Sequence, residues 1–300
     1  MKRKLKILIK LIKNFFNINY DEYVPYRCRE YSLYYFLRLD NLKFFRKNMI
    51  KYWHKKASAY EPFSPYFNKD KLTKYQKDMS LPEDVRNIYK SGSSTIENVL
   101  SATSLKFLNQ FCNTLDLNSN NNYVQVELPQ SLENIRHEIL NKLRPVHDHF
   151  FFNVLSQKKN SKIYVGVRID YSFDGVDSSP VTANWHVDRF LPTLNAIFFP
   201  NGSNWGEFEK DVGNPLITEK DIEYYINDKK KDKKTPEQIR DNLYVNINGR
   251  TKKKFSVKEN TMVVGTHHLQ HRRSPFNKPG KRVAIFIDYY NFFSRKDLTI

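Results

Sequence analysis

Three residues of this chain, His186, Asp188 and His271, have side chains that could bind one transition metal ion. His186 and Asp188 lie in the stretch 181–190, whose composition is typical of a strand. Because side chains two positions apart in a strand point to the same side, both residues could reach one ion. Two histidines and one carboxylate on one face of Fe(II) leave its other coordination positions open. The spacing therefore predicts a non-haem iron site formed by His186, Asp188 and His271.

A second pattern follows this candidate metal site near the end of the chain. Residues 260–272 read as a strand with a histidine-rich end, and residues 280–290 read as another strand, with turn-forming residues between them. We predict that His271 closes the first strand and that Arg282 opens the second. Arg282, Ala284 and Phe286 would then share one face. The planar guanidinium of Arg282 could bind a carboxylate inside a barrel.

These motifs resemble the Fe(II)/2-oxoglutarate-dependent dioxygenases, and most closely the phytanoyl-CoA-dioxygenase-like branch. The resemblance covers about residues 160–292 and rests on His186-x-Asp188, on His271 followed by x10 and Arg282, and on Gly280-x-Arg282. It implies a double-stranded β-helix, a jelly-roll core of the cupin-like kind. It also implies Fe(II) as cofactor, 2-oxoglutarate as cosubstrate with Arg282 as its binding residue, and O2 as co-reactant. Ala284 stands where many relatives carry serine or threonine.

The implied reaction is hydroxylation of an unidentified small-molecule or lipid- or saccharide-type substrate, with release of succinate and CO2. No catalytic residue is predicted beyond the metal ligands. Related halogenases have a small residue at the place of Asp188, so the intact aspartate argues against halogenation. Two alternatives stay open: a metal-dependent cupin-like activity without 2-oxoglutarate, and a catalytically silent jelly-roll that binds anionic lipid, polysaccharide or nucleic acid.

Other residues compete for parts of this interpretation. His268 is the next choice for the distal ligand, and His267 is a further candidate. Tyr164 or Arg168, from a predicted strand at 162–170, could face the pocket. The upstream histidines, which lie in stretches of helical character, are expected to be structural: His54, His137, His147 and His149.

Composition favours a folded protein that is mainly β with a helical extension. The chain has 300 residues, of which 40% are hydrophobic and 15% aromatic, enough for a packed core. We expect a mostly helical N-terminal extension over residues 1–120, packed on a jelly-roll core over 121–300 as one compact unit. Further strands are predicted at 122–128 and 194–199, and an amphipathic helix at 131–145. Two cysteines give no disulfide framework, which favours a reducing cytoplasm.

The net charge of +18 raises the question of anionic partners. Residues 1–16 form a basic amphipathic pattern that predicts either peripheral contact with the inner membrane surface or a helix packed on the barrel. The lysine-rich stretch 227–236 could attract an anionic substrate or be a solvated loop, with a helix start predicted at Thr235. No nucleic-acid-binding motif accompanies the charge, so nucleic acid is not expected as a partner.

Overall fold

The computed structural model describes residues 61–115, 123–155, 163–172, 194–202, 208–218, 251–255, 257–266, 271–273 and 279–289, together with single residues at 44, 48, 51, 58 and 276. The helices in these ranges are η2 (Ser64–Phe67), α4 (Lys69–Lys77), α5 (Glu83–Ser91), α6 (Ala102–Thr114), η3 (Gln130–Leu132) and α7 (Glu133–Leu155). The strands are β1 (Ser93–Glu97), β2 (Tyr123–Glu127), β3 (Ile163–Ser172), β4 (Leu194–Phe199), β5 (Phe208–Val212), β6 (Thr251–Phe255), β7 (Thr261–Thr266), β8 (His271–Arg273) and β9 (Gly280–Tyr289).

The described strands form two antiparallel sheets. The larger sheet has the order β1-β7-β4-β9-β3-β2, and the smaller one has the order β6-β5-β8. Along the chain, β4 lies in the larger sheet, β5 and β6 in the smaller one, β7 in the larger, β8 in the smaller and β9 in the larger. This alternation of strands between two antiparallel sheets is the jelly-roll arrangement. The predicted fold class, mainly β with a jelly-roll core flanked by helices, is confirmed.

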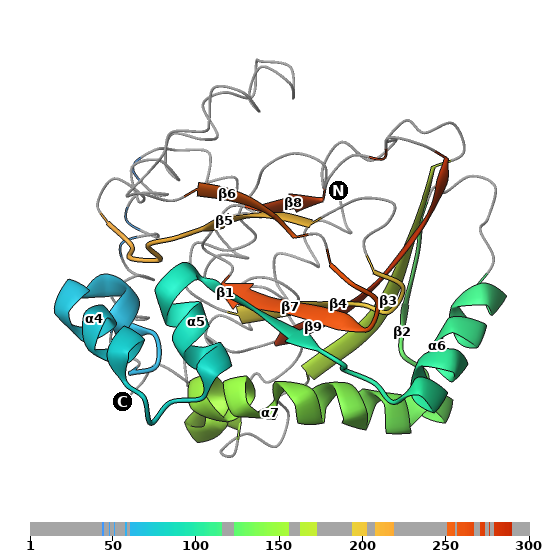
Figure 1. The fold of residues 1–300 in the computed structure, drawn as a ribbon, viewed down its shortest axis with the longest axis horizontal. Helices are drawn as coiled ribbons and strands as arrows, with labels where there is room; N and C mark the ends of the chain where they lie inside the picture. The colour runs from blue at the N-terminus through green and yellow to red at the C-terminus, as the bar shows by residue number, and fades with distance from the viewer. Residues whose placement is uncertain are drawn as a thin grey trace, which may run out of the picture.

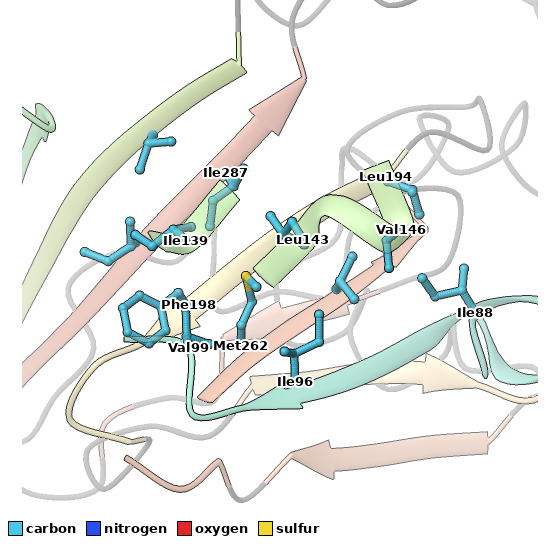
Figure 2. Close-up of a cluster of buried hydrophobic side chains, with 14 of the residues drawn as sticks. Ile88, Ile96, Val99, Ile139, Leu143, Val146, Leu194, Phe198, Met262 and Ile287 are labelled. Atoms are coloured by element: carbon cyan, nitrogen blue, oxygen red, sulfur yellow. The ribbon is translucent and has the colours of Figure 1, made fainter. Parts of the chain in front are cut away.

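The helices cover one face of the larger sheet, and the smaller sheet lies on its other side (Figure 1). The sequence predicted an amphipathic helix at 131–145, and α7 begins as expected but continues to Leu155. The apolar stripe predicted for this helix is Leu132, Ile135, Ile139 and Leu143; the last three are buried on α7, and Leu132, at the end of η3, is partly buried against the same core. Figure 2 shows Ile139 and Leu143 among side chains from the sheet, including Phe198 and Met262. Burial of this apolar face attaches α7 to the jelly-roll.

Strand β9 shows how the larger sheet separates its two faces. Val283, Ile285 and Ile287 belong to the large core cluster on the helix side. Ala284 and Phe286 pack in a second, smaller apolar cluster that also contains Ile197, Phe199, Val257 and Val263. The predicted alternation along this strand is therefore confirmed. We call the side of β3 and β9 that carries Arg168, Asp170, Arg282, Ala284 and Phe286 the inner face.

Most predicted strands are present, with one difference. β2, β3, β4 and β9 match the strands predicted at 122–128, 162–170, 194–199 and 280–290. The strand predicted over 260–272 is instead two elements, β7 in the larger sheet and β8 in the smaller one. His271 therefore opens a strand and does not close one.

The first 120 residues contribute to the larger sheet. β1 follows α5 after Gly92, whose φ of 79° ends the helix, and it pairs along β7. This strand lies in a stretch interpreted as mostly helical, and its polar sequence Ser-Ser-Thr-Ile-Glu carries a weak strand signal. The division at residue 120 stays a prediction. Among the helices that the structure describes, none is long and apolar enough to cross a membrane.

Candidate metal and cosubstrate site

The structure describes two of the four predicted site residues. His271 lies on β8 and Arg282 on β9. His186 and Asp188 lie outside the described residues, as do the competing histidines His267 and His268. Among the residues that the structure describes, there is no group of three or more histidine, cysteine or acidic side chains placed so that they could hold a metal ion. The metal triad and the choice between His271 and His268 therefore stay predictions.

His271 lies in the smaller sheet, where it is the first residue of β8. It stands opposite Lys210 of β5 in the antiparallel register, and only 6% of its surface is exposed. An imidazole in this setting can bind a metal through one nitrogen while the other nitrogen is held by a neighbouring group. The burial of His271 thus fits the role of a metal ligand.

Arg282 lies on the inner face of the larger sheet, as its place in the predicted strand indicated. Its Nη2 donates to Oδ2 of Asp170 at 3.1 Å, and the two side chains are 5% and 6% exposed. Asp170 stands directly opposite Arg282 in the pairing of β3 with β9. The guanidinium carbon of Arg282 also lies 5.4 Å from the ring centroid of Phe276, a distance typical of a cation–π contact.

Asp170 binds a second arginine through its other oxygen. Nε of Arg168 donates to Oδ1 of Asp170 at 3.0 Å, and Nη2 of Arg168 lies 3.0 Å from the same oxygen. Arg168 precedes Asp170 by two residues on β3, so both share one face of the strand. One buried carboxylate therefore bridges two guanidinium groups, and each of its oxygens binds a different arginine.

The role of Asp170 was not predicted from the sequence. Its one local signal is the pattern Arg168-x-Asp170 within a strand, where such spacing places opposite charges side by side. The partner that completes the cluster, Arg282, is distant in sequence, and the pairing of β3 with β9 brings it there. A charged residue is rarely buried without a partner, so this pattern within an otherwise apolar strand indicates a buried ion pair.

The helical histidines that the structure describes have structural surroundings. His137, His147 and His149 all lie on α7. His149 and His147 are two residues apart, and such residues do not face each other on a helix, so they do not form a metal pair. Nε2 of His149 lies 2.8 Å from the hydroxyl of Tyr89, which donates to the carbonyl of Pro62 at 2.7 Å. Burial lowers the pKa of His149, with a smaller opposing effect from Asp78.

Comparison with known proteins finds similar structures only. No family model matches the chain, and no curated protein sequence matches it. A Pseudomonas putida prolyl-4-hydroxylase is 12% identical, with a TM-score of 0.42 over 69% of this chain and 96% of that one. HygX from Streptomyces hygroscopicus, solved with iron bound, is 12% identical, with a TM-score of 0.45 over 71% of this chain and 87% of that one. The epimerase SnoN, solved with Fe3+, alpha ketoglutarate and nogalamycin RO, is 9% identical, with a TM-score of 0.43 over 74% of this chain and 84% of that one.

Proposed function

We propose that this chain is a non-haem Fe(II)- and 2-oxoglutarate-dependent oxygenase of the phytanoyl-CoA-dioxygenase-like kind. The observation that carries the proposal is Arg282, a buried arginine on the inner face of the last jelly-roll strand, whose guanidinium is held by Asp170. It follows the buried His271, which lies on the preceding strand of the smaller sheet. The His-x-Asp motif at 186–188 supplies the remaining ligand types that Fe(II) requires.

The residues of the chain have distinct roles in this proposal. His186, Asp188 and His271 would hold Fe(II), and Arg282 would bind the distal carboxylate of 2-oxoglutarate through charge-assisted hydrogen bonds. When bound, iron and cosubstrate together supply the activation of O2 that drives oxidation of the substrate, with release of succinate and CO2. Arg282 fits its role because it is almost fully buried, where a hydrogen-bonded ion pair is poorly screened by salt.

The apolar part of the inner face has its own function. Ala284 and Phe286 follow Arg282 on β9 and pack with Ile197 and Phe199 of β4. These side chains exclude water from the wall next to the arginine, and a low local dielectric strengthens the attraction between guanidinium and carboxylate. Ala284 has no hydroxyl, so it cannot supply the extra contact that many relatives make from this position.

The test measures metal content and turnover in the same preparation. The full chain, reconstituted with Fe(II) without oxygen, should bind about one iron per chain. On addition of O2 it should convert labelled 2-oxoglutarate to succinate, slowly without substrate and faster with a substrate found by metabolite screening. His271→Ala should lose iron, and His137→Ala, which changes an exposed histidine of α7, serves as the matched control. Iron binding without 2-oxoglutarate turnover would instead indicate a cupin-like activity of another kind.

One observation favours the second candidate function, a catalytically silent binding protein. The net charge of +18 would attract anionic lipid, polysaccharide or nucleic acid. A chain that binds no iron but binds such polyanions in a salt-dependent way would support this alternative.

A further inference from the structure

The inner face holds a three-residue ionic cluster that the proposed chemistry does not by itself require. Asp170 accepts from Arg168 with Oδ1 and from Arg282 with Oδ2, at 3.0 and 3.1 Å. The three side chains come from adjacent strands, β3 and β9, and share one face because of the register. All three side chains are largely buried: the exposed fraction is 16% for Arg168, 6% for Asp170 and 5% for Arg282.

The cluster restricts the rotamers of Arg282. An arginine side chain has several rotatable bonds, and ordering it on ligand binding costs conformational entropy. A carboxylate that already holds one end of the guanidinium removes part of that cost before a ligand arrives. The ring of Phe276, itself buried, lies against the guanidinium at 5.4 Å and further limits its plane.

Arg168 changes what Asp170 does to Arg282. A carboxylate bound to one arginine alone would neutralise it and weaken its attraction for an anionic ligand. Here the carboxylate is shared between two guanidinium groups, so the formal charges of the three side chains sum to a single positive charge. The cluster can therefore fix the position of Arg282 without the single carboxylate cancelling the charge of both arginines.

We propose that Asp170 is a positioning residue for the cosubstrate, because its carboxylate, shared with Arg168, holds Arg282 ready for the distal carboxylate of 2-oxoglutarate. This inference rests on the proposed function. Two other roles of the cluster make different predictions. An ion pair that only stabilises the sheet would affect all ligands equally when it is removed. A carboxylate that competes with the ligand for Arg282 would, when it is removed, make 2-oxoglutarate bind more tightly.

A pair of ligands separates these roles. 2-Oxoglutarate and 2-oxopentanoate have the same five-carbon chain and the same metal-binding end, but 2-oxopentanoate has a methyl group in place of the distal carboxylate. Their dissociation constants are measured by calorimetry on the full chain loaded with Mn2+ without oxygen, so that no turnover is needed. The variants are Asp170→Asn, Arg168→Gln and Arg282→Ala, and Asp148→Asn on α7 is the control for loss of one exposed carboxylate.

We expect Asp170→Asn to weaken 2-oxoglutarate binding about tenfold or more, a typical cost of removing a group that orients a binding residue. Binding of 2-oxopentanoate should not change. Arg282→Ala should bind both ligands with similar affinity, and adding Asp170→Asn to it should change neither further, since the two residues act through one interaction. Arg168→Gln, which leaves the bond between Asp170 and Arg282 in place, should weaken only 2-oxoglutarate and by less. It is also the variant to use if Asp170→Asn does not fold.

Several results would overturn the proposal. Equal weakening of both ligands in Asp170→Asn, or in Arg168→Gln where that variant replaces it, would assign the cluster to fold stability alone. Tighter binding of 2-oxoglutarate would make Asp170 a competitor. A wild-type chain that does not distinguish the two ligands, or an Arg282→Ala variant with unchanged affinity, would instead refute the cosubstrate role of Arg282 in the proposed function. The two failures are thus separable.

Discussion

Replacement of Arg282 tests both the stability and the ligand binding of the inner face. Arg282 is 5% exposed, and its Nη2 lies 3.1 Å from a carboxylate that is 6% exposed. Removing one partner of a buried ion pair typically destabilises a protein by about 3–5 kcal/mol. The bond from Arg168 to Asp170, 3.0 Å long in the wild-type chain, should persist in Arg282→Ala. We therefore expect a loss of unfolding free energy near the lower limit, about 3 kcal/mol.

The same change should affect cosubstrate binding by a similar amount. If the distal carboxylate of 2-oxoglutarate binds to Arg282, its loss costs about 3–5 kcal/mol for a buried pair. At about 1.4 kcal/mol per tenfold, the dissociation constant rises on the order of a hundred- to a thousandfold or more. Arg282→Lys should recover part of this loss, because the ammonium keeps the charge but cannot present two parallel N–H groups to one carboxylate.

The assays are urea denaturation for the unfolding free energy and calorimetric titration of 2-oxoglutarate at a temperature where each variant is folded. Arg144→Ala is the matched control. Arg144 lies on α7, and its guanidinium donates to Asn141 of the same helix in an exposed hydrogen bond, outside the strands that form the inner face. Wild-type affinity in a folded Arg282→Ala variant would refute the reasoning and make Arg168 the next candidate. Unchanged stability would show that the Asp170–Arg282 bond contributes little to the fold.

The remaining predictions concern the metal, the N-terminus and one histidine. Alanine at each of the three proposed metal ligands should largely abolish iron binding; if His268→Ala has this effect and His271→Ala does not, the distal ligand is misassigned. A chain starting near Asn17 should bind anionic vesicles more weakly than the full chain, since each basic residue contributes about 1 kcal/mol near such a surface; equal sedimentation would remove the membrane role, and insolubility would indicate that residues 1–16 pack on the core. Because burial lowers the pKa of His149, its contribution to stability is complete above about pH 6.5 and is lost as the pH falls through the lower, folded-state pKa. When the pH is lowered from 7.5 to 5.5, the unfolding free energy of His149→Gln should therefore fall by less than that of the wild type. Equal falls in the two proteins, measured by urea denaturation at each pH, would contradict this.

Local periodicity was sufficient for several elements of this protein. The helix stripe of Ile135, Ile139 and Leu143 predicted the apolar face of α7, and the alternation along β9 predicted which residues accompany Arg282. Both patterns depend only on the repeat of the backbone, which is 3.6 residues for a helix and two for a strand, so they can be read from neighbouring residues. The His-x-Asp and His-x10-Arg spacings likewise indicate a chemistry without any knowledge of distances.

Only the tertiary structure decided which strands meet and in what register. β1 joins the larger sheet although its polar sequence resembles a loop, because β7 offers a buried strand to pair with. β7 and β8, which look like one strand in the sequence, belong to different sheets. Asp170 and Arg282 are distant in the chain and meet because β3 and β9 pair in a register that places them opposite each other. Pairing between distant strands depends on how the whole core closes, and no local pattern carries that information.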